Sequence, residues 1–138
     1  MKKIILLIFL ATVLPSFTIT HSTFTIVGSW KATDKGKTIF MIFDREGYAL
    51  MGSEGKMLGG KSFDINGEKG TMSYKADLSK NPGTLDITIT RLSNKAQKKL
   101  LGIIKVVNDN EIRINLAGDI RPVTFDGPQT VTFTRVVM

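Results

Sequence analysis

The sequence contains no cysteine and only one histidine in 138 residues. Without cysteine the chain cannot form a disulfide scaffold, a thiolate zinc site, an iron–sulfur cluster or a cysteine nucleophile. Its length and its 42% content of hydrophobic residues are typical of one compact domain rather than two. These absences leave few chemistries open, and we expect no cofactor and no metal.

The first residues have the pattern of an export signal. Lys2 and Lys3 supply a positively charged start, and an almost unbroken apolar run over residues 4–14 ends at Pro15. A membrane-spanning helix needs about 20 apolar residues, so this run is too short to act as a stable membrane anchor. We therefore expect export without a transmembrane anchor.

The Thr- and Ser-rich segment over residues 16–25 is the expected cleavage region. A cut between Ser16 and Ser22 divides the chain into a signal peptide (residues 1–22) and a mature domain (residues 23–138). A lipoprotein anchor requires a cysteine at the new N-terminus, which this chain lacks. We expect a soluble protein in the periplasm or outside the cell.

Cleavage at the end of this segment also removes His21, the single histidine. The mature chain then has no imidazole, which excludes a Ser-His-Asp triad, a histidine metal site and the commonest general base. Loss of the two signal-peptide lysines leaves 17 basic side chains (19 − 2) against 12 acidic ones, a net charge of +5. The charges are interleaved, and the densest basic group is Lys95, Lys98 and Lys99, so no nucleic-acid partner is expected.

Apolar and polar residues alternate with a period of two along most of residues 27–137, and helical spacing is almost absent. Turn signals separate the alternating segments, and the strongest of them is Asn66-Gly67. We predict strands over residues 27–33, 38–43, 48–51, 61–65, 70–78, 84–92, 100–107, 111–117 and 130–137. Such short spacing favours pairing of sequence neighbours, and closure removes exposed edges. The predicted fold is all-β, an eight- to nine-stranded antiparallel up-and-down barrel.

Residues near both ends of the mature chain resemble a known signature. Gly28-Ser29-Trp30 resembles the G-x-W motif of lipocalins, and Arg135 lies where that family places an arginine over the tryptophan ring. The chain is also similar to small secreted bacterial lipocalin-like domains of uncharacterised function in the wording of residues 73–78, 85–90, 100–103 and 121–122. The resemblance implies a lipocalin-like barrel in which Gly28, Trp30 and Arg135 are structural residues. The late T-D-Y-type turn, the disulfides and the C-terminal helix of lipocalins are absent, which weakens any carry-over of transport function. No fixed motif marks the interior ligand site in such families, so no ligand residue is carried over.

Residues 55–62 match the G-x-x-x-x-G-K-[ST] pattern of a phosphate-binding loop. Such a loop needs a helix directly after it, with the N-terminus of the helix facing the phosphates. Residues 63–70, which follow, contain two glycines and an asparagine and are not expected to form a helix. We interpret the glycine-rich stretch over residues 52–60 as a flexible hairpin connection at a barrel mouth rather than as a nucleotide site.

The interior of the predicted barrel is the remaining place for a ligand. An eight-stranded barrel is just wide enough to be filled by its own side chains or to hold one small ligand. Methionine side chains suit both uses, because they adapt to irregular gaps and to pliable apolar pockets. The candidate ligand-binding residues are Phe40, Phe43, Tyr48, Met51, Met57, Phe63, Met72 and Tyr74. The sequence leaves open whether these side chains fill the barrel or line a cavity that opens at the end of residues 52–60.

Two functions are consistent with these patterns. The first is non-enzymatic binding of a small apolar molecule in or at the mouth of the barrel. The alternative is a protein–protein interaction module, such as a periplasmic hydrolase inhibitor or an envelope-associated partner, that uses the loops over residues 52–60 and 91–99. A hydrolase relying on Asp and Tyr side chains is a third option, but most acidic residues lie in predicted turns, where carboxylates are usually solvated.

Overall fold

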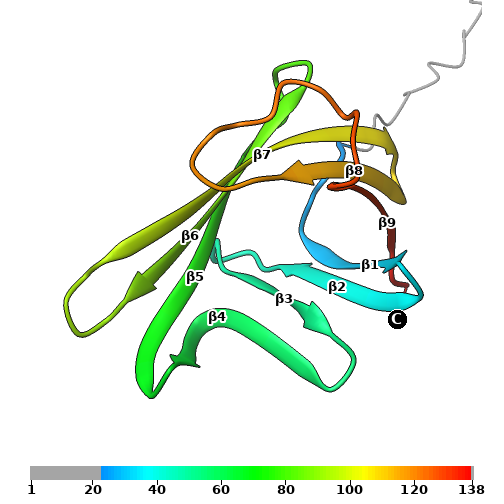
Figure 1. The fold of residues 1–138 in the computed structure, drawn as a ribbon. Helices are drawn as coiled ribbons and strands as arrows, with labels where there is room; N and C mark the ends of the chain where they lie inside the picture. Colours follow the sequence, from blue (N-terminus) through cyan, green and yellow to red (C-terminus); the bar gives the residue numbers. More distant parts are fainter. Residues whose placement is uncertain (1–22, 138) are drawn as a thin grey trace, which may run out of the picture.

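The computed structural model describes residues 23–137, and within that range it contains no helix. Nine strands pair in sequence order and close into an antiparallel barrel (Figure 1). The strands are β1 (Gly28–Asp34), β2 (Lys37–Phe43), β3 (Ala49–Ser53), β4 (Lys56–Ile65), β5 (Glu68–Asp77), β6 (Gly83–Arg91), β7 (Gln97–Asn108), β8 (Glu111–Leu116) and β9 (Thr130–Arg135). This confirms the predicted all-β up-and-down barrel, with nine strands.

The predicted signal peptide, residues 1–22, lies outside the described residues. Among residues 23–137 there is no helix of the length and apolar character needed to cross a membrane.

The glycine-rich stretch is mostly strand rather than a flexible connection, so that part of the prediction is wrong. A tight turn at Glu54 and Gly55 joins β3 directly to β4, and β4 begins at Lys56 instead of residue 61. Gly55 has a φ of 81°, a backbone conformation that glycine adopts without a steric penalty. The hairpin therefore forms because glycine supplies its turn, and the remaining glycines lie within the ladder.

Strand β4 bends sharply and belongs to two ladders. Its first half pairs with β3, with Leu50 opposite Gly59, and its second half pairs with β5, with Gly60 opposite Met72. Gly59 and Gly60 have φ values of 126° and 83°, and a Cβ on Gly59 would lie 2.3 Å from the Ala49 carbonyl oxygen. Only glycine fits this bend. Figure 1 shows β4 as an arch between β3 and β5.

The bend allows an odd number of strands to close antiparallel. Tyr48, just before β3, forms an antiparallel bridge with Ser73 of β5, so β3 and β5 are neighbours there and β4 fills the gap that opens between them. Because β4 fills this gap, β9 runs antiparallel to β1. In the ladder between them, Trp30 lies opposite Arg135 and Lys31 lies opposite Thr134. Closure of the barrel thus rests on a ladder of these two residue pairs.

The barrel has two different ends. Gly28 of β1 and Arg135 of β9 lie at one end, together with the β2–β3, β5–β6 and β7–β8 connections. We call this the closed end, because the side chain of Trp30 fills it. The opposite end, called the mouth, carries the β1–β2, β3–β4, β4–β5, β6–β7 and β8–β9 connections. The β4–β5 and β6–β7 hairpins project at the lower left of Figure 1.

The inner face of the barrel is apolar, because every second residue of each strand points inward. In β1, Trp30 and Ala32 are buried whereas Lys31 and Thr33 are exposed. The inner side chains form one cluster whose buried members are Ile26, Trp30, Ala32, Met41, Phe43, Ala49, Met72, Leu85, Ile87, Ile104, Ile112, Ile114 and Phe133. Burial of each large side chain stabilises the fold by about 1.5–3 kcal/mol, so this cluster is the main source of stability.

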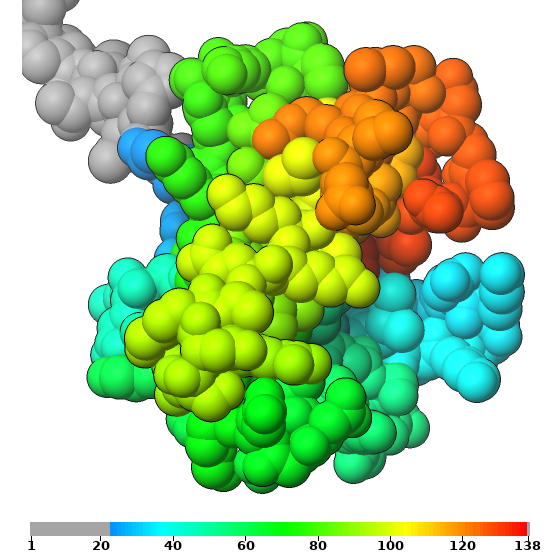
Figure 2. All heavy atoms as spheres, turned by 60° about the vertical axis from the view of Figure 1, so that its left-hand side comes forward, coloured from blue at the N-terminus to red at the C-terminus, as the bar shows by residue number. Residues whose placement is uncertain are grey.

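The loop between β8 and β9 covers part of the outer face. Figure 2 shows this loop (orange) lying against β7 (yellow). Ile103 faces outward in β7 yet is only 2% exposed, and the Asn115 side-chain amide donates a hydrogen bond to the Thr124 carbonyl oxygen at 3.0 Å. Arg121 fixes the loop further, because its Nη1 donates to Asp86 Oδ1 at 2.6 Å and to the Gly102 carbonyl oxygen at 2.7 Å.

The closed end is organised by the contact between an indole and a guanidinium. Trp30 is fully buried, and its Nε1 donates a hydrogen bond to the Ile26 carbonyl oxygen at 2.8 Å. The guanidinium carbon of Arg135 lies 4.2 Å from the centroid of the Trp30 ring, within cation–π range. A Cβ on Gly28, where φ is 137°, would lie 2.9 Å from Arg135 Nη1. Glycine at this position therefore leaves room for the guanidinium.

Arg135 also connects its own strand to two other segments by hydrogen bonds. Its Nη1 donates to the Val27 carbonyl oxygen at 3.0 Å, its Nη2 to that of Thr25 at 2.7 Å, and its Nε to that of Asp109 at 3.0 Å. Hydrogen bonds from a charged donor are stronger than neutral ones. One side chain thus joins the segment before β1, the β7–β8 turn and β9.

We expect Arg135→Ala to lower the free energy of unfolding by about 2–4 kcal/mol, because it removes the ring contact and leaves carbonyl groups without their donor. The change is measured by urea unfolding followed through Trp30 fluorescence. Lys31→Ala is the matched control, since Lys31 is exposed on the neighbouring strand and its loss is expected to change stability by less than about 0.5 kcal/mol. Equal effects of the two substitutions would contradict the role assigned to Arg135.

Candidate functional site

The interior side chains at the mouth are apolar but only partly covered. They pack against the buried cluster, and they are Ile39, Met51, Phe63, Ile89, Leu100, Leu116 and Val131. Leu58, opposite Met51 in the β3–β4 ladder, is 40% exposed. At the closed end, by contrast, Trp30 and Phe43 are at most 1% exposed. The barrel therefore presents apolar interior side chains to solvent at the mouth, whereas the Trp30 and Phe43 side chains are covered.

A hollow of about 320 Å³ lies at the mouth, where the β4–β5 and β6–β7 hairpins project. Its lining consists of Ile65, Ile89, Arg91, Ala96, Gln97 and Lys98. Ile89 also packs against the core cluster, so the floor of the hollow continues into the barrel interior. The volume lies at the lower end of the roughly 300–1,000 Å³ range of small-molecule sites.

Charged groups around this hollow are unevenly paired. Arg91 Nε lies 3.8 Å from Glu68 Oε2, and Lys69 Nζ lies 2.9 Å from Asp64 Oδ1. Lys98 is opposite Ile89 in the β6–β7 ladder and has no ion-pair partner among residues 23–137. The mouth therefore combines apolar interior side chains with a surplus cation.

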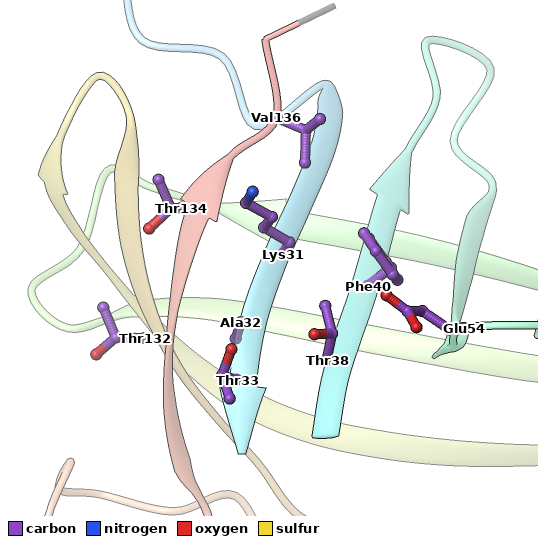
Figure 3. Close-up of a pocket in the computed structure, with 9 residues that line it drawn as sticks. All are labelled: Lys31, Ala32, Thr33, Thr38, Phe40, Glu54, Thr132, Thr134 and Val136. Atoms are coloured by element: carbon purple, nitrogen blue, oxygen red, sulfur yellow. The ribbon is translucent and has the colours of Figure 1, made fainter. Parts of the chain in front are cut away.

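A second hollow, of about 480 Å³, lies on the outer face of the sheet where β1 and β9 separate beyond their short ladder. Figure 3 shows its side chains on β9, β1, β2 and the β3–β4 turn. They are Lys31, Ala32, Thr33, Thr38, Phe40, Glu54, Thr132, Thr134 and Val136. The threonines suit a solvated sheet surface, and Phe40 is the one aromatic ring among the residues that line the hollow. This hollow lacks the apolar floor that the mouth has.

Five of the eight candidate ligand residues belong to the interior cluster: Phe43, Met51, Phe63, Met72 and Tyr74. Phe43 and Met72 are 1% and 3% exposed, so both fill the barrel rather than line an open space. Met51 and Phe63 are half-buried near the mouth. The structure thus places Phe43 and Met72 in the filled part of the barrel, and Met51 and Phe63 at its accessible end.

The other three candidates do not point into the barrel. Phe40 lines the outer hollow, and Met57, opposite Gly52, is 36% exposed on the outer face. Tyr48 lies in the β2–β3 connection, where its backbone N–H donates to Asp44 Oδ1 at 2.8 Å. The run of apolar residues around Phe40 gives no alternation to show which of them face inward. Its pairing with β3 decides this and turns Ile39 and Met41 inward.

Sequence reasoning missed Ile65, Ile89, Leu100 and Lys98 as residues of the mouth. The candidate ligand residues predicted from the sequence are all methionine or aromatic residues, so they do not include the aliphatic side chains of the long strands. The alternation that ends at Ile89 was visible in the sequence and already indicated an inward-facing row. Lys98 carried no such signal, because its face depends on its register with β6.

Tyr74 holds the closed end together and has no free reactive group. Its hydroxyl donates a hydrogen bond to the Asp44 carbonyl oxygen at 2.8 Å, and its ring meets Phe43 edge-on with centroids 4.8 Å apart. Burial, and to a lesser extent the negative charge of Asp44, raise the pKa of the Tyr74 phenol. At neutral pH the phenol is therefore a fixed hydrogen-bond donor.

The motifs that resemble reactive sites have structural explanations. The phosphate-loop pattern over residues 55–62 lies in a tight turn and in strand β4, where no helix follows. Asp77 accepts hydrogen bonds from the Ser79 hydroxyl and backbone N–H, which lower the pKa of its carboxyl group. Among residues 23–137 no group of three or more His, Cys, Asp or Glu side chains is placed to hold a metal ion.

We expect Tyr74→Phe to reduce stability by about 1 kcal/mol at pH 7, through loss of one hydrogen bond. Because the pKa of Tyr74 is higher in the folded state, its stabilisation is complete below about pH 10 and declines as the unfolded phenol ionises. The free energy of unfolding of the unmodified protein therefore falls more steeply above pH 10 than that of the variant. Urea unfolding between pH 7 and 11 measures both curves, and parallel curves would contradict the pKa shift.

No protein-family profile, no curated protein and no solved structure matches this chain.

Proposed function

We propose that this protein is an exported, soluble, non-enzymatic binding protein that holds a small apolar molecule at the mouth of its barrel. We also propose that it belongs with the small secreted bacterial lipocalin-like domains. The G-x-W segment, Arg135 and the closed nine-stranded barrel support that relationship. The export pattern of residues 1–22 supports a periplasmic or extracellular location.

The observation that carries the proposal is the difference between the two ends of the interior. At the closed end Trp30 and Phe43 are 0% and 1% exposed. At the mouth, interior residues such as Met51 and Ile89 are only partly buried, and Ile89 lines a hollow of about 320 Å³. Apolar surface left in contact with water favours binding of an apolar molecule that covers it.

The side chains available also favour binding over catalysis. Residues 23–138 contain neither histidine nor cysteine, so the commonest general base and the thiol nucleophile are lacking. The phenol of Tyr74 is tied to a backbone carbonyl, and the carboxyl group of Asp77 to Ser79. These groups stabilise turns and packing.

We expect the purified protein to bind the neutral fluorescent probe N-phenyl-1-naphthylamine, and Ile89→Asp to weaken this binding at least about tenfold, because a carboxylate in the hollow disfavours an apolar ligand. The matched control is Thr88→Asp, which places the same charge on the outer face of the same strand. Fluorescence titration measures both affinities, and circular dichroism confirms folding. Absence of probe binding, or equal loss in both variants, would refute the proposal.

A specific observation also favours the second candidate, a protein–protein interaction module. Ile120 and Val123 are each 84% exposed, although the loop that carries them is held in place at Arg121 and at Thr124. The Asp86 hydrogen bond raises the pKa of Arg121, against the opposing effect of burial, so the cation that holds this loop stays charged. Exposed aliphatic side chains on a loop that is held in place are typical of protein–protein interaction surfaces. It lies apart from the loops at residues 52–60 and 91–99 that the sequence suggested.

For this candidate, we expect the immobilised protein to retain a stoichiometric partner from a cell-envelope extract, and the double variant Ile120→Asp/Val123→Asp to lose it. Two charges on a surface that a partner buries are costly to desolvate. The same variant is expected to bind the neutral probe with unchanged affinity, because its substitutions are outside the hollow. If the unmodified protein retains no partner, the interaction-module function is wrong.

A further inference from the structure

We propose that the gap in the barrel wall between β1 and β9 binds an extended segment of another protein, which adds its backbone to the two strands as a further β-strand. This site is the outer hollow of about 480 Å³, and it shares no lining residue with the hollow at the mouth. The inference therefore goes beyond the proposed function and does not rest on it. It depends on unpaired strand edges, on the side chains beside them and on two unpaired charges.

Both strands continue past the point where they stop pairing with each other. The ladder between them ends at Lys31 and Thr134. Beyond it, β1 runs on to Asp34 and stays paired with β2, and the first residues of β9, from Thr130, stay paired with β8. Each strand therefore has one edge in this region without a ladder partner, and such an edge is what an added strand pairs with.

The hydrogen bonds of the closed part identify which backbone groups face the gap. The Val136 N–H donates to the Ser29 carbonyl oxygen at 2.8 Å, whereas the Arg135 N–H donates on the opposite side, to the β7–β8 turn, at 2.8 Å. Backbone groups of antiparallel strands alternate in this way, so every second residue turns its N–H and C=O toward the gap. The next residues in that position past the ladder are Thr33 of β1 and Thr132 of β9, and both line the hollow.

The hollow lies at this gap and suits a polypeptide backbone. Ala32 is among its lining residues, although the Ala32 side chain faces the interior and the residue is 6% exposed. An inward-facing residue lines an outer hollow through its backbone, so the strand edge itself is accessible. Unpaired N–H and C=O groups at strand spacing are complemented by another backbone, which supplies both kinds of group in the same alternation. A lipid chain does not supply them.

The side chains around the gap indicate the sequence of the segment. On the outer face it meets four threonines and the half-buried ring of Phe40. β-Branched residues pack well against such a surface. On the inner side, Ala32 and Phe133 are 6% and 4% exposed and belong to the core cluster, so small residues fit there. We therefore expect outward β-branched residues to alternate with inward alanine or glycine.

Two unpaired charges lie beside the gap. Lys31 and Glu54 line the hollow, and neither has an ion-pair partner among residues 23–137 (Figure 3). Lys31 lies at the end of the β1–β9 ladder, and Glu54 lies in the β3–β4 turn at the mouth side. Opposite charges on a bound strand complement this pair. The segment is therefore expected to carry an acidic residue toward one end and a basic residue toward the other.

The first test measures backbone hydrogen exchange by NMR in the unmodified protein. We expect the Thr33 and Thr132 amides to exchange at least about tenfold faster than those of Ala32 and Phe133, which turn toward β2 and β8. Equal protection of all four amides would show that the strands are paired across the gap, and it would overturn the inference.

The binding test uses the fluorescein-labelled peptide Asp-Ala-Val-Ala-Val-Ala-Lys-amide and fluorescence polarisation. We expect the peptide to bind and to slow exchange of the Thr33 and Thr132 amides at least about fivefold. The same peptide with N-methyl groups on its valines and alanines keeps the side chains but loses the backbone donors, so we expect it to bind at least about tenfold more weakly. Absence of binding by the first peptide, or equal binding of both, would overturn the inference.

Thr132→Pro removes the N–H that faces the gap and leaves the β8–β9 hydrogen bonds in place. We expect it to weaken peptide binding at least about tenfold, whereas Thr132→Ala, the matched control, keeps that N–H and is expected to stay within about threefold of the unmodified protein. Circular dichroism confirms folding. If Thr132→Pro does not fold, the N-methylated peptide provides the same comparison on the unmodified protein. Equal affinities of the two folded variants would contradict backbone pairing.

Two further arms distinguish other occupants and other sites. Excess N-phenyl-1-naphthylamine is expected to leave the peptide bound, and displacement would place the peptide at the mouth and overturn the inference. Sedimentation measures whether the chain associates with itself. A dimer that is lost in Thr132→Pro would assign the gap to a second copy of this chain and overturn the inference, whereas a monomer that binds the peptide supports it.

Discussion

The contact of Arg135 with Trp30 joins the first and last strands of a sheet that has few other means of closing. The ladder between β1 and β9 consists of two residue pairs, and one of them is Trp30 with Arg135. The guanidinium lies on the indole and donates to carbonyl groups of the segment before β1 and of the β7–β8 turn. Backbone pairing, cation–π attraction and charged hydrogen bonds therefore act at one place, and the rest of the barrel depends on that closure.

Closure at this end leaves the two halves of the interior with different properties. Trp30 and Phe43 are buried at the closed end, whereas Met51, Ile89 and Leu100 at the mouth are only partly covered. The bend of β4 at Gly59 and Gly60 adds to the asymmetry, because it spreads β3 away from β5 toward the mouth. A fold that fills one end of a narrow barrel and opens the other retains stability and still offers apolar surface for a ligand.

Charge is distributed in accordance with this division. The cation at the closed end, Arg135, contacts an indole ring and donates hydrogen bonds to backbone carbonyl groups. Around the hollow at the mouth, Asp64 pairs with Lys69 and Glu68 with Arg91, whereas Lys98 has no ion-pair partner among residues 23–137. The outer face is fixed by Arg121 on Asp86, which holds a long loop against β7 and leaves Ile120 and Val123 bare. The hollow at the mouth and this loop therefore lie on different parts of the molecule.

The alternation of apolar and polar residues determined the all-β barrel, most strand positions and the burial of Trp30, because a period of two is a local property of a strand. The tertiary structure alone decided that Ile39 rather than Phe40 faces inward, that residues 56–60 form strand, and that Lys98 rather than Lys99 lies on the interior face. These outcomes depend on register between strands distant in sequence and on the bend of β4. A shift of one residue in the register of a strand reverses which of its side chains face the interior. The local sequence pattern does not contain this information.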